Sequence, residues 1–175
     1  MSAPGHTLTG MSMTGTPTRT HTLTIPSPVG PITLRAHDTA LTAVEIGTAL
    51  DATEGQHTRT PHPILSMAAA QLDEYFAGVR TEFDLPLELA GTDFQLAVWE
   101  ALETIPYGQT RSYADIADLI GKHGAARAVG GAVGANPIPI IIPCHRVMGA
   151  NGAITGYSGG DGISTKKALL ERESR

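Results

Sequence analysis

SYADIADLIGKHGAARAVGGAVGAN, residues 112–136, has the pattern of two short helices joined by a turn that contains glycine. Ser112 and Asp115, three residues apart, form a capping box that starts the first helix, and Gly121 is suited to end it. The second helix is predicted over roughly 125–135 and stops before a proline. Such a corner is typical of a helix-turn-helix, in which the residues expected to face the core are Ile116, Leu119, Ile120, Val129 and Val133.

The second of these helices consists almost entirely of alanine and glycine, with Arg127 as its only charged residue. A glycine inside a helix costs up to about 1 kcal/mol relative to alanine, so Gly130, Gly131 and Gly134 need a reason. One interpretation is close packing against another part of the protein. The other is a smooth surface laid against a broad partner, and the minor groove of DNA both admits a shallow element and attracts arginine. The pattern leaves both interpretations open.

PIIIPCHRVM, residues 139–148, holds the only cysteine of the chain, Cys144, directly before His145. We expect a short strand at 140–142 that Pro143 ends. Neighbouring side chains of an extended segment point to opposite faces, so a turn or a bridging water must connect the thiol with the imidazole. A histidine that accepts the proton of the thiol leaves a thiolate, a strong nucleophile at neutral pH, and needs a carboxylate to orient it. The downstream candidates for that carboxylate are Asp161, Glu171 and Glu173.

The first half of the chain has the pattern of a small mixed unit. Short β-rich runs at about 20–25, 31–36 and 40–46 predict an antiparallel meander. A polar loop follows, and an amphipathic helix is predicted over 63–79, with Val79 among its apolar positions. Residues 1–17 are predicted to be a disordered tail because they contain few large apolar groups.

The second half begins after a boundary expected near Gly91. Thr92 and Gln95 form a second capping box, which predicts a helix with Phe94, Val98, Ala101 and Ile105 on one face. The acidity of the protein lies in the first half: residues 1–90 carry 4 basic and 9 acidic side chains, whereas residues 91–175 carry 8 of each. The net charge of −5 therefore does not exclude a nucleic-acid partner for the second half.

A single cysteine excludes an internal disulfide and zinc sites built from several cysteines, which favours a reducing, cytosolic setting. No stretch of 18 uninterrupted apolar residues predicts a membrane span, and we see no secretory signal.

These segments resemble the O6-alkylguanine-DNA alkyltransferases, also called methylated-DNA–protein-cysteine methyltransferases. The resemblance covers nearly all of 91–173 and lies in GTDFQLAVWEALETIPYGQTRSYADIA, ARAVGGAVGANPIPIIIPCHRV, GYSGG and KKALLERE. The PCHRV block after Asn-Pro is the most specific part. The first half matches more loosely, through YFAG and FDLPL.

The fold that the resemblance implies is α+β. Residues 18–90 would form a small ribonuclease-H-like domain of a β-meander and a helix. Residues 91–175 would form a helical, winged-helix-like domain that carries the helix-turn-helix.

The function that the resemblance implies is DNA repair by a methylated-DNA–[protein]-cysteine S-methyltransferase. Such a protein binds double-stranded DNA that contains O6-alkylguanine, turns the damaged base out of the helix, and transfers the alkyl group irreversibly to Cys144. It acts once and needs no cofactor, because the lesion supplies the alkyl group. We expect a cytoplasmic, bacterial-type monomer without a membrane partner, and assembly of several molecules along DNA stays open. The alternatives are a protein that binds alkylated DNA without repairing it, and a cysteine hydrolase that uses Cys144 and His145.

The resemblance also assigns roles to residues. The catalytic group would be Cys144, His145, Glu173, Asn136 and Tyr113. The base pocket would use the carbonyls of Cys144 and Val147, the backbone of Ser158, and Tyr157. The DNA contacts would come from Arg127, Ala126, Gly130 and Gly131.

Two further expectations concern departures from the family pattern. The segment between Gly160 and Lys166 is about two residues longer than usual, which keeps Glu171 as an alternative to Glu173. No metal site is implied, because the first half lacks the cysteines of the zinc site found in some family members. The histidines of the first half are predicted to be surface residues: His6, His21, His37, His57 and His62.

Overall fold

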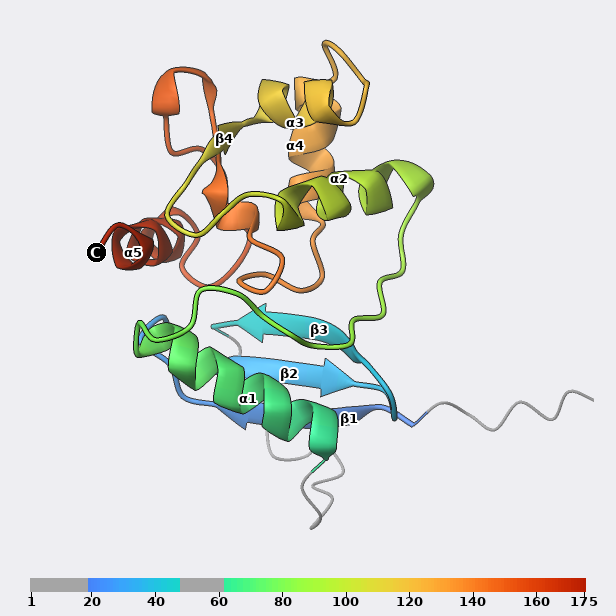
Figure 1. The fold of residues 1–175 in the computed structure, drawn as a ribbon, viewed down its shortest axis with the longest axis vertical. Helices are drawn as coiled ribbons and strands as arrows, with labels where there is room; N and C mark the ends of the chain where they lie inside the picture. Colours follow the sequence, from blue (N-terminus) through green and yellow to red (C-terminus); the bar gives the residue numbers. More distant parts are fainter. Residues whose placement is uncertain (1–18, 48–61) are drawn as a thin grey trace, which may run out of the picture.

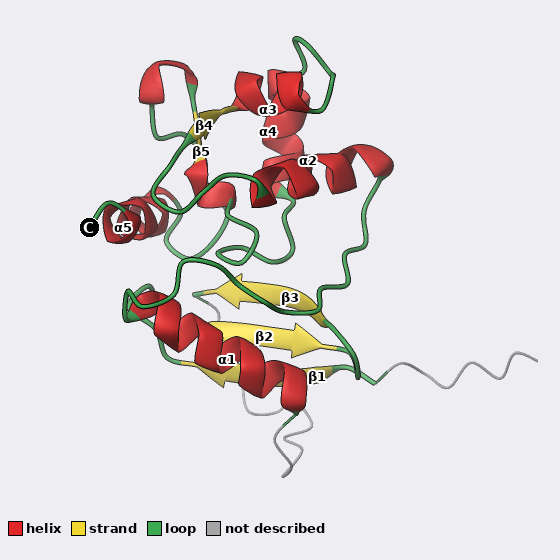
Figure 2. Ribbon diagram, in the orientation of Figure 1, coloured by secondary structure: helices red, strands yellow, loops and turns green. Residues whose placement is uncertain are grey.

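The computed structural model describes residues 19–47 and 62–175, and it has the expected α+β fold (Figure 1). A three-stranded sheet with one helix makes up the first half, and four helices with a two-stranded sheet make up the second (Figure 2). The predicted tail at 1–17 and nearly all of the predicted polar loop lie outside the described residues.

The meander of the first half is confirmed. Strands β1 (His21–Ile25), β2 (Ile32–Ala36) and β3 (Leu41–Ile46) pair antiparallel in the order β1-β2-β3. Helix α1 (Pro63–Phe76) covers one face of this sheet (Figure 1). Its buried residues are Leu65, Ala68, Gln71, Leu72 and Tyr75.

Helix α1 ends earlier than predicted, at Phe76 rather than at residue 79. Gly78 has a positive φ of 77°. The amide of Val79 donates to the carbonyl of Glu74, and the amide of Gly78 donates to the carbonyl of Tyr75. This pair of hydrogen bonds is a Schellman motif, which closes a helix through a left-handed glycine. Val79 therefore leaves the apolar face and is 77% exposed.

The second half contains the two predicted capping boxes. They start helix α2 (Asp93–Glu103) at Thr92 and helix α3 (Tyr113–Leu119) at Ser112. Its other elements are β4 (Arg111–Ser112), α4 (Ala126–Gly134), β5 (Val147–Met148), α5 (Ile163–Glu173), and single 3-10 turns at Cys144–Arg146 and Ala150–Gly152.

Helices α3 and α4 form the predicted helix-turn-helix and both pack against α2. The indole of Trp99 on α2 donates to the carbonyl of Ala132 on α4 over 2.8 Å, which fixes the two helices together. One inward position was predicted wrongly: Leu119 is 61% exposed. Ala117 and Ile116 are the buried residues of this short helix, so its apolar face is rotated away from Leu119.

The apolar segment before Cys144 is a turn, so the strand predicted at 140–142 is wrong. Ile140 has a positive φ of 74°, and the amide of Ile142 donates to the carbonyl of Ile138 over 3.0 Å. Prolines at 137, 139 and 143 remove backbone donors that a strand in a sheet would need. Three isoleucine side chains of this turn are fully buried: Ile138, Ile140 and Ile142.

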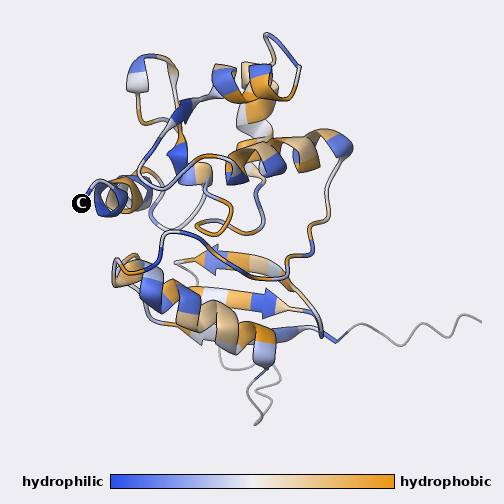
Figure 3. Cartoon of the chain, viewed as in Figure 1, coloured by the Kyte–Doolittle hydropathy of each residue, from blue (hydrophilic) through white to orange (hydrophobic). Residues whose placement is uncertain are grey.

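One hydrophobic core runs through both halves. Figure 3 shows hydrophobic and hydrophilic residues alternating along α1 and α2. The halves also share backbone hydrogen bonds, in which Val44 donates to Pro137 and Gly160 donates to Ile46. Within the ranges described, no helix combines the length and apolar character that a membrane span requires.

Candidate active site and DNA-facing helix

Cys144 opens the 3-10 turn Cys144–Arg146 and forms part of the wall of a cavity of about 310 Å³. The thiol residue is only 5% exposed, so the cavity is its route to a ligand. The other lining residues are Tyr113, Gly130, Val133, Gly134, Gly156, Tyr157 and Ser158. The arrangement is a narrow pocket with a nucleophile on its wall.

Three elements far apart in the sequence build this cavity. Strands β4 and β5 pair in parallel with Arg111 opposite Val147, which brings Tyr113, the first residue of α3, beside the chain that leaves Cys144. The third wall is the 156–158 loop. The hydroxyl of Ser158 donates to the carbonyl of Gly134 over 3.1 Å and thereby holds this loop against α4.

His145 is fully buried and is paired with Glu173 at the end of α5. Its Nε2 lies 2.7 Å from Oε1 of Glu173. Arg146 donates to the same carboxylate from Nε over 2.8 Å and from Nη2 over 3.0 Å, and its Nη1 donates to the carbonyl of Ile105 over 2.6 Å. The bidentate arginine fixes the carboxylate in position, and the carboxylate in turn orients the imidazole.

Two further donors to the Glu173 carboxylate come from outside the Cys144–Arg146 turn. The phenol of Tyr75 on α1 donates to Oε1 of Glu173 over 2.8 Å, and the amide of Gly108 donates to Oε2 over 3.2 Å. Gly108 has a positive φ of 74°, and a Cβ there would lie 2.9 Å from the carbonyl oxygen of Glu173. Only glycine fits this approach without a shift of the backbone.

The five hydrogen bonds to Glu173 keep it ionised. Burial by itself raises its pKa, but the hydrogen bonds from His145 and Arg146 outweigh burial and lower the pKa of Glu173 to about 2. Burial lowers the pKa of His145, although Glu173 opposes this, so the imidazole is neutral at neutral pH. A neutral imidazole that donates from Nε2 has its lone pair on Nδ1. Nδ1 of His145 is buried and has no hydrogen-bond partner among the described residues, so it is free to accept a proton.

The thiol of Cys144 is protonated in the resting protein at neutral pH. Burial raises the pKa of Cys144, while hydrogen bonding by Asn136 and the charge of Lys166 reduce this rise. The hydroxyl of Tyr157 interacts with the thiol electrostatically, yet no hydrogen bond of normal geometry joins them. Proton transfer must therefore accompany attack by the sulfur.

Asn136 braces the turn that leads to Cys144. Its Nδ2 donates to the carbonyl of Ile142 over 2.9 Å, and its Oδ1 accepts from the amide of Ile138 over 3.0 Å. The two bonds close both ends of the buried isoleucine turn, which explains how a positive φ at Ile140 is maintained.

Lys166 on α5 is fully buried and ties the loop around the cavity to the protein. Its ammonium group donates to the carbonyl of Val147 over 2.6 Å and to that of Thr155 over 3.0 Å. The carbonyl of Val147 was predicted to accept a hydrogen bond from the amine of a guanine. Because Lys166 already donates to this carbonyl, only its second lone pair is left for a base.

The glycines of α4 face open space, which favours the interpretation as a contact surface. A Cβ at Gly131 or Gly134 would meet nothing within 4 Å, and one at Gly130 would touch only the ring of Tyr113, at 3.8 Å. Arg127 is exposed on the same helix and Ala126 is half-buried at its start. The glycines are therefore not needed for close packing inside the protein.

The comparisons with known proteins agree with this geometry. Residues 93–175 match the family described as "6-O-methylguanine DNA methyltransferase, DNA binding domain", and residues 21–89 match its "ribonuclease-like domain". The chain belongs to this family. The family resemblance and the fold expected from the sequence are thus both confirmed.

Individual relatives cover most of the chain. The methylated-DNA–protein-cysteine methyltransferase of Mycobacterium bovis is 58% identical over 156 residues, which are 87% of this chain and 92% of that protein. The inducible enzyme of Bacillus subtilis is 56% identical over 107 residues, 61% of this chain and 59% of that protein. The crystal structure of Mycobacterium tuberculosis OGT in complex with DNA superposes with a TM-score of 0.76 at 56% identity, covering 88% of this chain and 92% of that one.

Most residues that the family resemblance singled out come together in the structure. Cys144, Tyr113, Tyr157 and Ser158 line one cavity with Gly130, whereas His145 and Glu173 form a buried pair outside its lining. Glu171 and Asp161 are exposed, so the carboxylate beside His145 is Glu173. Arg127 and Gly131 do not line this cavity and belong to the outer surface of α4.

The sequence analysis did not identify four residues that surround Glu173 and the Cys144 cavity: Tyr75, Gly108, Arg146 and Lys166. Arg146 could have been found from its place in the Cys-His-Arg motif, since a buried carboxylate needs a cation. No local pattern marks Tyr75 or Lys166, because each occupies an ordinary apolar-face position of a helix and meets the site only through the tertiary fold.

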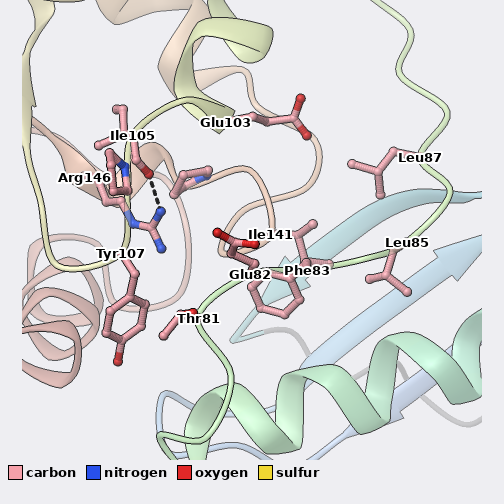
Figure 4. Close-up of a pocket in the computed structure, with 12 residues that line it drawn as sticks. Thr81, Glu82, Phe83, Leu85, Leu87, Glu103, Ile105, Tyr107, Ile141 and Arg146 are labelled. Carbon is pink, nitrogen blue, oxygen red and sulfur yellow. Dashed lines mark hydrogen bonds between the residues drawn. The ribbon is translucent and has the colours of Figure 1, made fainter.

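A second cavity, of about 320 Å³, lies between the 81–87 segment and the second half (Figure 4). Glu82, Phe83, Glu103 and Arg146 are among its lining residues, and Cys144 is not. The figure shows the guanidinium of Arg146 bonded to the carbonyl of Ile105. This cavity shares no lining residue with the cavity at Cys144.

The prediction that the histidines of the first half lie on the surface is wrong for His21, which is buried. His21 is 9% exposed, and the ring of the half-buried His62 stacks on it with centroids 4.1 Å apart. His37 is half-buried and pairs with Glu88 over 3.1 Å. His6 and His57 lie outside the described residues.

Proposed function

We propose that this member of the O6-methylguanine DNA methyltransferase family repairs O6-alkylguanine in double-stranded DNA by moving the alkyl group to the sulfur of Cys144. One observation carries the proposal: Cys144 lines a cavity, and the residue directly after it, His145, is buried and paired with Glu173. The family match gives the reaction class, a methylated-DNA–protein-cysteine methyltransferase acting in DNA repair.

The alkyl transfer is a displacement at carbon. The sulfur–carbon bond forms as the bond between carbon and O6 of guanine breaks, and the bonding electrons stay with the base. The thiol proton passes to Nδ1 of His145, directly or through a water, and the ionised Glu173 stabilises the resulting imidazolium. The departing guanine takes up one proton, for which the phenol of Tyr113 in the cavity wall is the donor we propose. The proton held by His145 then passes through water to the Tyr113 phenolate, so both side chains end neutral.

The product is a thioether, whose carbon–sulfur bond no residue of the site is placed to break. Each molecule would therefore act once, and the reaction needs no cofactor because the lesion supplies the alkyl group. The cavity of about 310 Å³ is large enough for one purine base.

The target base must leave the duplex before it can enter this cavity, because its O6 is otherwise stacked within the helix. We propose that α4 lies in the minor groove, where the open Gly131 position allows a close approach and Arg127 fills the space of the extruded base. The carbonyls of Cys144 and Val147 would accept from the amine of the base, while the backbone of Ser158 would contact the alkylated oxygen and Tyr157 would pack against the ring. Ala126 and Gly130 would contact the backbone of the DNA.

Several organisational features are part of the same proposal. Residues 18–90 and 91–175 would be separate domains, a division supported by the separate family matches at 21–89 and 93–175. A monomer suffices, since one chain supplies every group named above. A free nucleophilic cysteine also fits the reducing bacterial cytoplasm.

The test is intact-protein mass spectrometry after mixing the protein with a duplex that contains one O6-methylguanine. We expect a gain of one methyl group, located on the Cys144 peptide, and never more than one per molecule with excess lesion. Multiple turnovers would contradict the proposal.

A Cys144→Ala variant separates repair from binding alone. We expect it to bind the lesion duplex with the affinity of the wild type and to transfer nothing. If wild-type protein binds the lesion but gains no mass, the chain is an alkylated-DNA-binding protein. Sustained hydrolysis of an ester or peptide would instead support a cysteine hydrolase.

A further inference from the structure

Two histidines and an aspartate of the first half converge at one end of its sheet. His21 is the first residue of β1, Asp38 lies in the turn between β2 and β3, and His62 directly precedes α1. The strand register sets His21 opposite Ala36, so the turn after β2 folds over the start of β1. Nε2 of His21 lies 2.9 Å from Oδ1 of Asp38, and the His62 ring stacks on the His21 ring.

The spacing of these three side chains suits a metal ion. One nitrogen or oxygen atom from each lies within 4.8 Å of the corresponding atoms of the other two. Zinc binds imidazole nitrogen and carboxylate oxygen at about 2.0–2.2 Å, so two ligands of a tetrahedral ion are roughly 3.4 Å apart. The two stacked imidazole rings would have to turn so that their in-plane lone pairs meet at the ion, which would replace the hydrogen bond between His21 and Asp38. We propose that His21, Asp38 and His62 bind one divalent transition-metal ion of the Zn²⁺ type, with water in the fourth position.

The surroundings of His62 support a ligand role rather than a helix-capping role. It occupies the N-cap position of α1 but makes no capping hydrogen bond, and histidine is not among the residues favoured there. Its Nδ1 is buried and has no hydrogen-bond partner within the described part of the chain. A buried, unpaired imidazole nitrogen costs free energy unless something binds it.

The charges of the region also favour a cation. Asp38 is exposed, and its carboxylate supplies a negative charge beside the two imidazoles. Residues 1–90 carry 9 acidic against 4 basic side chains, which makes the potential of this half attractive to a cation.

The ion would act as a clamp. It would join the start of β1, the β2–β3 turn and the start of α1, three segments that are separate in the sequence. None of the three residues lines the Cys144 cavity, so the ion would stabilise the first half without taking part in alkyl transfer. The site contains no cysteine, which distinguishes it chemically from thiolate-bound zinc.

The test measures Zn²⁺ binding to the full-length, untagged protein after treatment with a chelator. Every sample carries Cys144→Ser, which removes a competing thiolate. We expect native mass spectrometry to show one Zn²⁺ per molecule and calorimetry to show at least a tenfold weaker affinity for His21→Asn and His62→Asn. The matched control is His37→Asn, because His37 lies beside Asp38 but pairs with Glu88, and it should bind Zn²⁺ like the unmodified site.

A second variant and a second readout distinguish the loss of the metal site from misfolding of a variant. Asp38→Asn changes an exposed turn residue, so it should fold normally and still bind Zn²⁺ more weakly. Saturating Zn²⁺ should raise the melting temperature of the unmodified site, EDTA should reverse this, and His62→Asn should show no rise. The proposal is overturned if the protein takes up no Zn²⁺, or if the three ligand variants bind it as tightly as His37→Asn.

Discussion

The hydroxyl of Tyr75 on α1 donates a 2.8 Å hydrogen bond to the carboxylate of Glu173 at the end of α5. The two residues are 98 positions apart, and both are buried. Because Glu173 also orients His145, this bond connects the first half of the chain directly to the proposed alkyl-transfer group. The first half therefore supports the position of the proposed catalytic carboxylate in addition to packing against the second half.

The Tyr75→Phe variant tests this connection. Removal of a buried hydrogen bond to a charged group costs about 1.5 kcal/mol or more of unfolding free energy. We expect slower methyl transfer at an unchanged affinity for the lesion duplex, because Glu173 would hold His145 less firmly. Stopped-flow transfer assays and urea unfolding measure the two effects.

Tyr107→Phe is the matched control for this variant. Tyr107 is also near α5, but its hydroxyl donates to the backbone carbonyl of Arg172, over 3.4 Å, and not to Glu173. Its loss should leave the transfer rate nearly unchanged. Equal transfer rates in the two variants and the wild type would show that Tyr75 does not position Glu173.

The low pKa of Glu173 predicts a loss of stability in acid. Its folded pKa is about 2, against an ordinary value of 4.5, so the folded state binds fewer protons than the unfolded state between these values. Its contribution is complete above pH 4.5, is lost as the pH falls toward 2, and amounts to roughly 3 kcal/mol for a shift of this size. Urea unfolding at several pH values from 7 to 3 should show this decline.

Glu173→Gln should start from a lower stability, because it leaves Arg146 with a buried and unpaired charge. Its stability should nevertheless fall less steeply below pH 4.5 than that of the wild type. Glu171→Gln, at an exposed position of the same helix, should keep the wild-type slope. Parallel slopes for all three proteins would count against the role given to Glu173.

The raised pKa of Cys144 predicts slow reaction with simple alkylating agents. Burial keeps the thiol protonated at neutral pH, so iodoacetamide should modify it more slowly than it modifies free cysteine. The rate should increase with pH through values above the ordinary thiol pKa of 9.0. Mass spectrometry of timed samples gives the rate, with N-acetylcysteine as the reference, and a plateau already reached below pH 7 would disprove a neutral resting thiol.

The open position at Gly131 predicts opposite effects on stability and DNA binding. Gly131→Ala should stabilise the protein by up to about 1 kcal/mol, because alanine is the better helix former and its Cβ meets no atom within 4 Å. Gly131→Leu should also fold, yet its bulk should weaken binding to duplex DNA at least tenfold if α4 lies in the groove. Thermal unfolding and fluorescence anisotropy distinguish the effects; unchanged DNA affinity for the leucine variant would place the DNA elsewhere.

The sequence by itself determined the features that depend on residues close together in the chain. The capping boxes at Thr92 and Ser112, the three-stranded meander and the corner between α3 and α4 each follow from hydrogen bonds or periodicities that span a few residues. Even here the helix end at Phe76 was missed, because the left-handed Gly78 was overlooked. The candidate nucleophile was also evident, since Cys144 is the only cysteine.

Only the tertiary structure decided how distant side chains meet. It set Glu173 rather than Glu171 or Asp161 against His145, brought Tyr75 to the same carboxylate, and replaced an expected strand by the buried turn around Ile140. It also assembled His21, Asp38 and His62 from three separate segments. These contacts form because burial of the shared core fixes the orientation of α1, α5 and the sheet together, and no short stretch of sequence contains that information.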